Sequence, residues 1–342
     1  MTNSEQPIQR APQSPAHEGG AHAGQPPETP ASAPASASAP VPAPASAAPI
    51  AIWLCVLLGA GAALVGLLPW LVTGMRLPLQ NLWAFETMPE DMPIALLPFS
   101  QYAVTSIVGL LVTGAVVGGI LARGLRRRMP RRGFAALVVT LLAVQAIAVG
   151  QSAVTVGDGL QHRAESTLYL SALVALAVLS MLVGLLLLWL VARAPRAGAL
   201  IGLAFGAIAA GFWLGFLVHP IGSIVTYDSV WVSTALRFAP AVLIGAAIAW
   251  CGLDTVGRIV AAIASLIVLW IAPALATAVS SAVGMRVLAS RLGEMLDYGL
   301  GVFALASTMP ELVLPPLLVA VVVAAVGLAG RAVRTRRRPT DD

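Results

Sequence analysis

Long apolar runs separated by short polar segments dominate the pattern of hydrophobic and polar positions from residue 50 to residue 330. Each run is about 20 residues long, which is the length that a helix needs to cross the hydrocarbon core of a bilayer. The pattern therefore predicts eight transmembrane helices. We place them at residues 50–73, 101–122, 133–153, 167–192, 198–218, 233–252, 257–281 and 310–330.

The composition agrees with this pattern. Hydrophobic residues make up 58% of the chain, charged residues make up 10%, and the mean hydropathy is +0.88, whereas a soluble domain is about a quarter charged. The predicted fold class is all-α, a polytopic integral membrane protein with about eight transmembrane helices. Small residues let helices approach closely in lipid. We therefore expect the glycine-rich helix 198–218 inside the bundle and the bulky helix 167–192 facing lipid.

Positive charge is distributed unevenly between the connections. All 20 basic residues are arginines, and the segment RGLRRRMPRR, Arg123–Arg132, holds six of them. The connections after the second, fourth and sixth helices and the C-terminus hold 14, whereas the other connections hold five arginines and nine acidic residues. Because arginine-rich connections stay in the cytoplasm, both termini are predicted to be cytoplasmic, in a multi-pass protein of the plasma membrane.

The net charge of +5 and the pI of about 10.0 also raise the question of a nucleic-acid partner. No aromatic residues interleave with the basic clusters, as a single-stranded nucleic-acid site would require, so we expect none. The partners that the charges favour are the lipid bilayer and, at the cytoplasmic arginine clusters, its anionic lipids. The sequence leaves open whether the chain also binds other membrane proteins.

Three segments differ in composition. Residues 1–48 are rich in proline, alanine and serine, and such a segment cannot bury enough apolar surface to fold. We predict a disordered cytoplasmic tail that is either a solvated linker or a ligand for a partner domain. Residues 49–331 form the predicted eight-helix transmembrane domain, and residues 332–342 form a basic cytoplasmic C-terminal tail.

Five prolines lie within the predicted helices, all in the half nearer to the outside. They are Pro69, Pro240, Pro273, Pro315 and Pro316. Each proline removes a backbone donor, and unpaired backbone groups at membrane depth must be covered by protein or line a wet cavity. The pattern favours an outward-facing crevice between the first, sixth, seventh and eighth helices. Prolines accommodated in ordinary membrane helices are the alternative.

Four polar residues of the outer segments are candidate substrate-binding residues. They are His219, Asp228, Arg237 and Glu311. Arg237 stands just before Pro240, and it either pairs with Asp228 or Glu311 beside a substrate path or extends to the membrane interface. Glu311 also stands three residues after Thr308, which predicts a capping box at the start of the last helix.

A second polar group lies in the segment DGLQHRAES. Asp158, His162 and Glu165 have the spacing of one helical face and would hold a metal there. Gly157 and Gly159 disfavour a helix at this point, so a solvated loop is expected and no metal is assigned.

The two cysteines and the remaining motifs give little chemistry. Cys55 and Cys251 lack metal-ligand spacing and are interpreted as packing residues. The sequence has no phosphate-binding glycine loop, zinc-protease motif or GxSxG. We therefore assign no catalytic residue and no cofactor.

The last outer segment predicts a short amphipathic helix in the outer interface. Its apolar face is Met285, Leu288, Leu292 and Leu296, and its polar face is Arg286, Ser290, Glu294 and Asp297. This helix either roofs the crevice or packs on lipid headgroups.

Three functions fit these features. The first is a permease-like protein that moves a lipid or an apolar solute through the outward-facing crevice. The second is a non-catalytic membrane subunit or assembly factor of a cell-envelope complex, favoured by the scarcity of ionisable residues in the membrane helices. The third is a membrane enzyme that acts on lipid-linked substrates at the outer face, where His162, His219 and nearby acids would be its reactive groups. The absence of a reactive motif disfavours the enzyme.

Overall fold

The structure is a computed structural model that describes residues 50–220, 227–285, 287 and 291–336. The chain divides into two units, Met1–Ser46 and Ala47–Asp342, and the described residues all belong to the second. The predicted N-terminal tail and the last six residues of the predicted C-terminal tail lie outside the described residues.

The described residues form helices joined by connections without regular strands. The first elements are α1 (Ile52–Val72), η1 (Pro89–Asp91), η2 (Gln101–Ala103), α2 (Val104–Gly124), α3 (Gly133–Gly159) and α4 (Ala164–Arg193). They are followed by α5 (Arg196–Val218), α6 (Tyr227–Leu236), α7 (Ala239–Cys251), α8 (Val256–Gly284), α9 (Leu292–Thr308) and α10 (Pro310–Arg336). Eight helical stretches of this part of the chain are long and apolar enough to cross a membrane, with α6 and α7 contributing one between them. The predicted all-α polytopic fold is confirmed.

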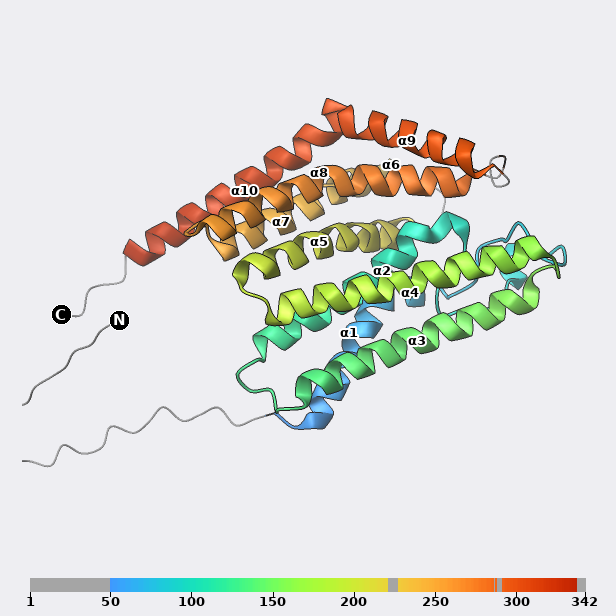
Figure 1. Ribbon diagram of the computed structural model, residues 1–342, viewed down its shortest axis with the longest axis horizontal. Helices are drawn as coiled ribbons and strands as arrows, with labels where there is room; N and C mark the ends of the chain where they lie inside the picture. The colour runs from blue at the N-terminus through green and yellow to red at the C-terminus, as the bar shows by residue number, and fades with distance from the viewer. Residues whose placement is uncertain (1–49, 221–226, 286, 288–290, 337–342) are drawn as a thin grey trace, which may run out of the picture. The chain divides into compact units, whose positions relative to one another are not determined.

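The helices form two halves of the same plan. In the first half α1 packs against α2 and α3, and α2 packs against α4; in the second, α5 packs against α7 and α8, and α7 packs against α10. The third and fourth spans of each half, α3 with α4 and α8 with α10, touch more lightly. Figure 1 shows the blue-to-green half beside the yellow-to-red half. The halves meet where α2 and α4 pack against α5, and α9 is an additional helix of the second half.

Close backbone contacts hold the centre of the bundle together. A side-chain carbon at Gly66 of α1 would lie 2.5 Å from the Leu110 carbonyl oxygen and 2.8 Å from the Gly114 Cα of α2. Helix α2 buries 67% of its most apolar stretch, more than any other span among the described residues. The central helix is therefore α2, although α5, which we expected inside the bundle, also contacts both halves.

Helix α4 is only partly the lipid-facing helix that its uniform apolar sequence predicts. One face, which includes Leu173, Ala177 and Gly184, is buried, and the helix packs extensively against α2. The opposite face, with Leu179 and Leu182, is exposed. Apolar side chains surround the whole helix, so the sequence pattern does not show which face meets protein.

The loop between α1 and α2, residues 73–103, fills the interior of the first half. Leu97 and Phe99 are fully buried in it. The Leu97 N–H donates to the Ser152 hydroxyl (2.8 Å), and the Trp70 indole donates to the Ala95 carbonyl (2.7 Å). Irregular backbone at membrane depth needs such partners from the surrounding protein. The loop therefore works as a plug between α1, α3 and α4.

Two further side chains complete the pairing of this plug. Gln151 of α3 accepts from the Leu96 N–H (2.8 Å) and donates to the Ile94 carbonyl (3.1 Å). Gln80 donates to the Phe99 carbonyl (2.9 Å) and accepts from the Tyr169 hydroxyl of α4 (2.6 Å). Gln151 and Ser152 of α3 are thus explained by the plug, whereas the buried Gln145 donates to the Leu111 carbonyl of α2 (2.8 Å).

Arginines pair with carbonyls at the ends of two helices. Arg123 donates to the carbonyls of Val191 and Ala194 at the end of α4 (2.7 and 3.1 Å). Arg331 donates to the carbonyl of Trp250 at the end of α7 (3.0 Å). The last carbonyls of a helix lack helical donors and attract a cation, so Arg123 ties α2 to the end of α4 and Arg331 ties α10 to the end of α7.

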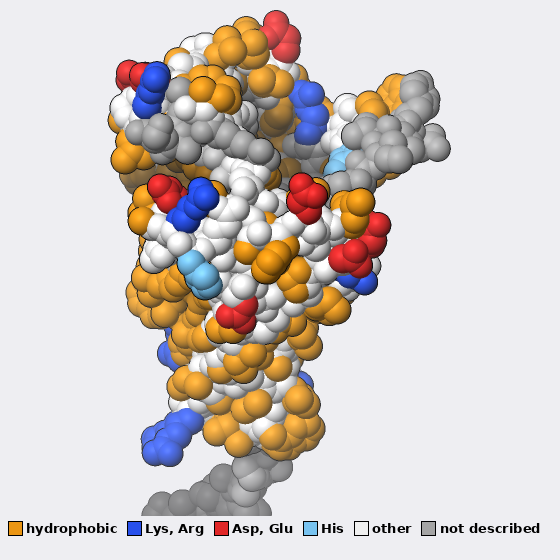
Figure 2. All heavy atoms as spheres, turned by 90° about the vertical axis from the view of Figure 1, so that its right-hand side faces the viewer, with side chains coloured by type: hydrophobic (Ala, Val, Ile, Leu, Met, Phe, Trp, Pro, Cys, Tyr) orange, Lys and Arg blue, Asp and Glu red, His pale blue; other side chains and the backbone are white. Residues whose placement is uncertain are grey.

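These contacts define the two ends of the bundle. The Ile50 N–H donates to the Arg128 carbonyl (2.9 Å), so the chain enters α1 beside the arginine-rich connection. The last turns of α10 lie at the same end of the bundle, where Arg331 contacts the end of α7. We call this the arginine end. The opposite end carries the plug and the α3–α4 and α8–α9 connections, and we call it the loop end. Figure 2 faces it, with acidic, basic and histidine side chains spread over it.

Several helix boundaries differ from the prediction, and two of them change the segments at the loop end. Helix α3 continues through Gly157 to Gly159, so the expectation of a loop there is wrong. The Trp83 ring packs where a side-chain carbon of Gly159 would lie, 1.8 Å from a ring atom. Helix α9 begins at Leu292, past residues 286 and 288–290, which lie outside the described part, and it runs back along α8.

We expect Gly66→Ala to destabilise the protein by about 1–3 kcal/mol, because the added carbon meets backbone that cannot move aside. Thermal unfolding of the purified protein in detergent measures the effect. Gly61→Ala on the same helix is the control, since a side-chain carbon there meets nothing within 4 Å. Equal unfolding temperatures of the two variants would contradict the α1–α2 packing.

Candidate functional site

The second half has two breaks in its helices, one within the sixth span and one between α9 and the last span. The sixth span changes from α6 to α7 at Arg237 and Phe238, and α9 gives way to α10 at Met309. Trp270, in the middle of α8, donates its indole N–H to the Ser307 carbonyl (2.9 Å). This places the second interruption beside the middle of a spanning helix.

The two interruptions meet through Arg237. Its guanidinium donates to the carbonyl oxygen of Glu311 (3.2 Å) and lies 5.0 Å from the centre of the Phe238 ring. In a regular helix the Glu311 carbonyl would accept from the N–H of residue 315, but that residue is proline and has none. Arg237 therefore supplies the donor that Pro315 removes.

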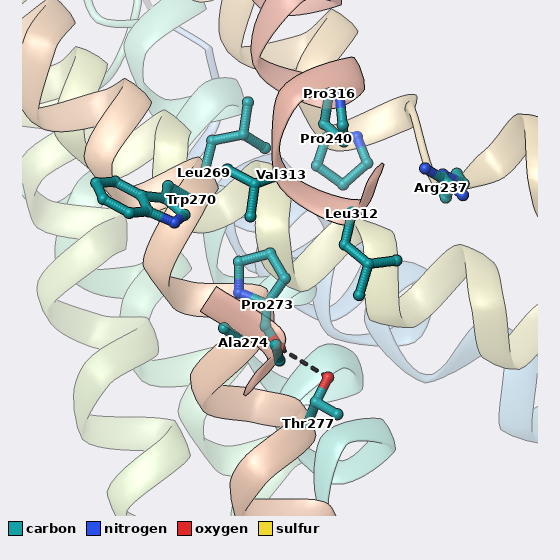
Figure 3. Close-up of a pocket in the computed structure, with 11 residues that line it drawn as sticks. Arg237, Pro240, Leu269, Trp270, Pro273, Ala274, Thr277, Leu312, Val313 and Pro316 are labelled. Atoms are coloured by element: carbon teal, nitrogen blue, oxygen red, sulfur yellow. Dashed lines mark hydrogen bonds between the residues drawn. The ribbon is translucent and has the colours of Figure 1, made fainter. Parts of the chain in front are cut away.

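A cavity of about 270 Å³, here the Arg237 cavity, lies where these spans meet α8. It is lined by Arg237, Pro240, Leu269, Trp270, Pro273, Ala274, Thr277, Ala306, Leu312, Val313 and Pro316. Figure 3 shows Arg237 at one edge, on the segment between α6 and α7, and Thr277 at another, with apolar side chains between them. The site is thus mainly apolar, with a single charged group.

A second cavity of similar volume, here the α5 cavity, shares part of this lining. Arg237, Pro240 and Pro273 line both cavities, and the α5 cavity extends along α5 from Ile208 to Val218. Gly211 makes room for Pro240, since a side-chain carbon there would lie 2.6 Å from the proline ring. Arg237 therefore stands between two adjoining apolar spaces.

Prolines leave acceptors beside the Arg237 cavity. Pro273 and Pro316 deprive the carbonyls of Leu269 and Leu312 of their ordinary helical donors, and both leucines line the cavity. The Thr277 hydroxyl donates to the carbonyl of Pro273 (2.9 Å). A bound molecule would meet backbone acceptors here in addition to the guanidinium.

Pro69 of α1 and Pro315 of α10 do not line the Arg237 cavity. Neighbouring side chains donate to the carbonyls that these two prolines leave without a helical donor. Pro69 is buried in α1, and the carbonyl of Val65, four residues before it, accepts from the Trp213 indole (3.1 Å). Arg237 donates to the Glu311 carbonyl, which Pro315 leaves without a helical donor. The predicted grouping of all five prolines around one crevice is therefore reduced to Pro240, Pro273 and Pro316.

The four predicted site residues are placed differently. Arg237 and Glu311 are brought together, but through the Glu311 carbonyl oxygen. Asp228 lies on α6, and its side chain is outside the described part. His219 follows α5, is half-buried, and donates its backbone N–H to the Gly215 carbonyl (2.8 Å). It is not among the residues that line either cavity.

The predicted capping box at Thr308 and Glu311 is wrong. Thr308 is the last residue of α9, and its hydroxyl donates to the Ala304 carbonyl of that helix (2.7 Å). Helix α10 begins with Pro310, and Met309 accepts from the N–H of Leu312 (3.2 Å). The helix before Thr308 offered its hydroxyl a nearer partner than the helix after it.

Sequence reasoning missed Trp270, Thr277 and the interruption at Met309. Pro310 gave a usable signal, because the residue before a proline is pushed out of the helical conformation. Trp270 and Thr277 gave none, since the approach of α9 to α8 depends on tertiary packing.

Metal and thiol chemistry finds no support in the described residues. They contain no group of three His, Cys, Asp or Glu side chains that could hold a metal. Asp158 ends α3, whereas Glu165 begins α4, so with His162 they do not share a helical face. Cys55 and Cys251 are buried and free.

Comparisons with protein-family models, curated proteins and solved structures find no match to this chain.

We expect Arg237→Ala to lower the stability by about 1 kcal/mol, the usual contribution of one hydrogen bond. Pro315→Ala should offset this loss, because it returns an N–H to the Glu311 carbonyl. A double-mutant cycle of thermal unfolding in detergent measures the coupling between the two substitutions. Arg291→Ala is the control, since that exposed arginine pairs only with Glu294 among the contacts of the described residues. Additive effects would contradict the pairing.

Proposed function

We propose that this chain is a permease-like protein of the plasma membrane that moves a lipid or an apolar solute through the Arg237 cavity. The observation that carries the proposal is the contact through Arg237 between the interrupted sixth span and the start of α10, beside a cavity lined by prolines. Transporters commonly build their substrate sites from discontinuous helices near the middle of the membrane.

The lining of the cavity supports the substrate class. Leu269, Trp270 and Val313 offer apolar contact, and Arg237 is the one charged side chain of the lining. We propose that the guanidinium binds the polar end of the substrate while the apolar part lies against α8 and α10. Asp228 on α6 and His219 after α5 are proposed as residues of the rim.

The orientation rests on the arginines. The arginine end holds the connections that are rich in arginine, together with the start of the first span and the end of the last one. Such connections stay in the cytoplasm, so the loop end faces outward in this proposal. The interruption at Met309 lies at the start of α10, and the cavity would therefore open towards the outer leaflet.

A second candidate function is a non-catalytic membrane subunit of an envelope complex. The plug exposes large apolar side chains at the loop end, with Phe85 78% and Met88 64% exposed. Exposed apolar groups outside the spans fit a protein partner or the membrane interface. If the permease tests fail, this is the reading that the plug supports.

The topology is tested by cysteine labelling in intact cells. We expect a cysteine replacing His162, in the exposed α3–α4 connection, to react with a membrane-impermeant thiol reagent. A cysteine replacing Arg128, at the arginine end, should react only after permeabilisation. The parent is the background control because Cys55 and Cys251 are buried. Labelling at position 128 in intact cells would overturn the orientation.

The substrate role of Arg237 is tested by movement of a fluorescent phospholipid across proteoliposomes and by complementation of a gene deletion. We expect Arg237→Ala to impair both at least about tenfold, roughly 1.4 kcal/mol, and Arg237→Lys to restore them only in part because lysine lacks the planar fork. Arg291→Ala should behave as the parent.

The Pro315 variant separates structure from substrate binding. In Arg237→Ala/Pro315→Ala the fold is repaired but the guanidinium stays absent, so we expect normal unfolding with activity still lost. Activity equal to the parent in the double variant would show that Arg237 only holds α10, and would contradict the proposed site.

A further inference from the structure

The beginning of α4 offers hydrogen-bond donors for which the described residues supply no side-chain partner. Arg163 is the residue before the helix, and no side chain caps this end. The first N–H groups of a helix have no helical partner and carry a partial positive charge, which together favour a phosphate. This helix is 30 residues long, so its dipole is fully developed.

A polar cavity of about 390 Å³ lies at this helix end. Its lining includes His162, Arg163, Ser166, Thr167 and Ser171. Ser166 is only 5% exposed, and within the described part of the chain its hydroxyl oxygen has no hydrogen-bond partner. A buried hydroxyl without a partner is costly unless something binds it. The cavity therefore joins donors, a cation and an unsatisfied hydroxyl.

Farther along, α3 and α4 also border an apolar groove. A second cavity, of about 590 Å³, is lined there by Ala143, Ala146 and Gly150 of α3 and by Val178 and Leu182 of α4. The nearest residues of the two cavities on α4, Ser171 and Val178, are separated by about 10 Å of helix. One molecule with a polar head and an apolar chain would span both.

In the second half of the chain an additional helix lies beside the corresponding pair of helices. There α8 and α10 take the places of α3 and α4, and α9 packs along α8 and touches α10. Gly299 of α9 lies against Ala282 of α8, with 3.3 Å from an added side-chain carbon. The described part of the first half places no helix at its own seam, where Val178 and Leu182 are exposed.

We propose that the α3–α4 seam is a phospholipid site, with the phosphate at the beginning of α4 and an acyl chain in the groove. The phosphate accepts from the first N–H groups of α4, from Ser166 and from Arg163. Glu165 and Asp158 are exposed acids nearby, so the fit depends on directed donors more than on net charge. This site is separate from the Arg237 cavity and does not depend on the proposed transport.

The test measures phospholipid retained by the purified full-length protein, by native mass spectrometry after addition of dioleoylphosphatidylglycerol. We expect the parent to retain lipid and Arg163→Gln/Ser166→Ala to retain at least about fivefold less. Gly150→Leu should have a similar effect, because position 150 is open and a leucine there fills the groove. Gly301→Leu, at an equally open glycine of α9, is the control.

Thermal unfolding of each variant accompanies the measurement, so that a loss of lipid is separated from a loss of fold. Inorganic phosphate in excess distinguishes the two sources of the anion. Retention that resists phosphate and falls in both seam variants supports a phospholipid. Displacement by phosphate with no effect of Gly150→Leu would assign the polar cavity to a free anion and overturn the proposal, as would equal retention in all variants.

Discussion

The structure depends on one constraint, that backbone polar groups within a bilayer must find partners inside the protein. Regular helices meet it by themselves, but this chain repeatedly departs from regular helix. The plug between α1 and α2 is paired by Gln80, Gln151 and Ser152. The gaps left by Pro69 and Pro315 are filled by Trp213 and Arg237. Polar side chains in this membrane domain serve the backbone first.

The spans were predictable because hydropathy over some 20 residues is a strong signal. The features that failed depend on contacts across the chain. Glycines at 157 and 159 each cost a helix about 1 kcal/mol, yet α3 continues because Trp83 packs on Gly159. The sequence could not reveal that contact, since it joins residues far apart in the chain.

The candidate site shows the same division. The prolines identify in advance which carbonyls lose their donors, and Arg237 was correctly singled out as a residue near them. Glu311 was named with Asp228 as a partner, but through its carboxylate, because a cation beside several acids is expected to choose such a group. The structure gives Arg237 the Glu311 carbonyl, which is a useful acceptor only because residue 315 is proline. The proline and the arginine therefore have to be considered together.

The two halves share a plan but differ in what fills them. In the first half the plug occupies the space between α1, α3 and α4 at the loop end, through Trp70, Ser152 and Tyr169. The corresponding helices of the second half, α5, α8 and α10, line the Arg237 and α5 cavities instead. Conversely, α9 covers the α8 seam, whereas the α3–α4 seam is hollowed. The open spaces of the two halves thus lie at different places, and they are where other molecules have room to bind.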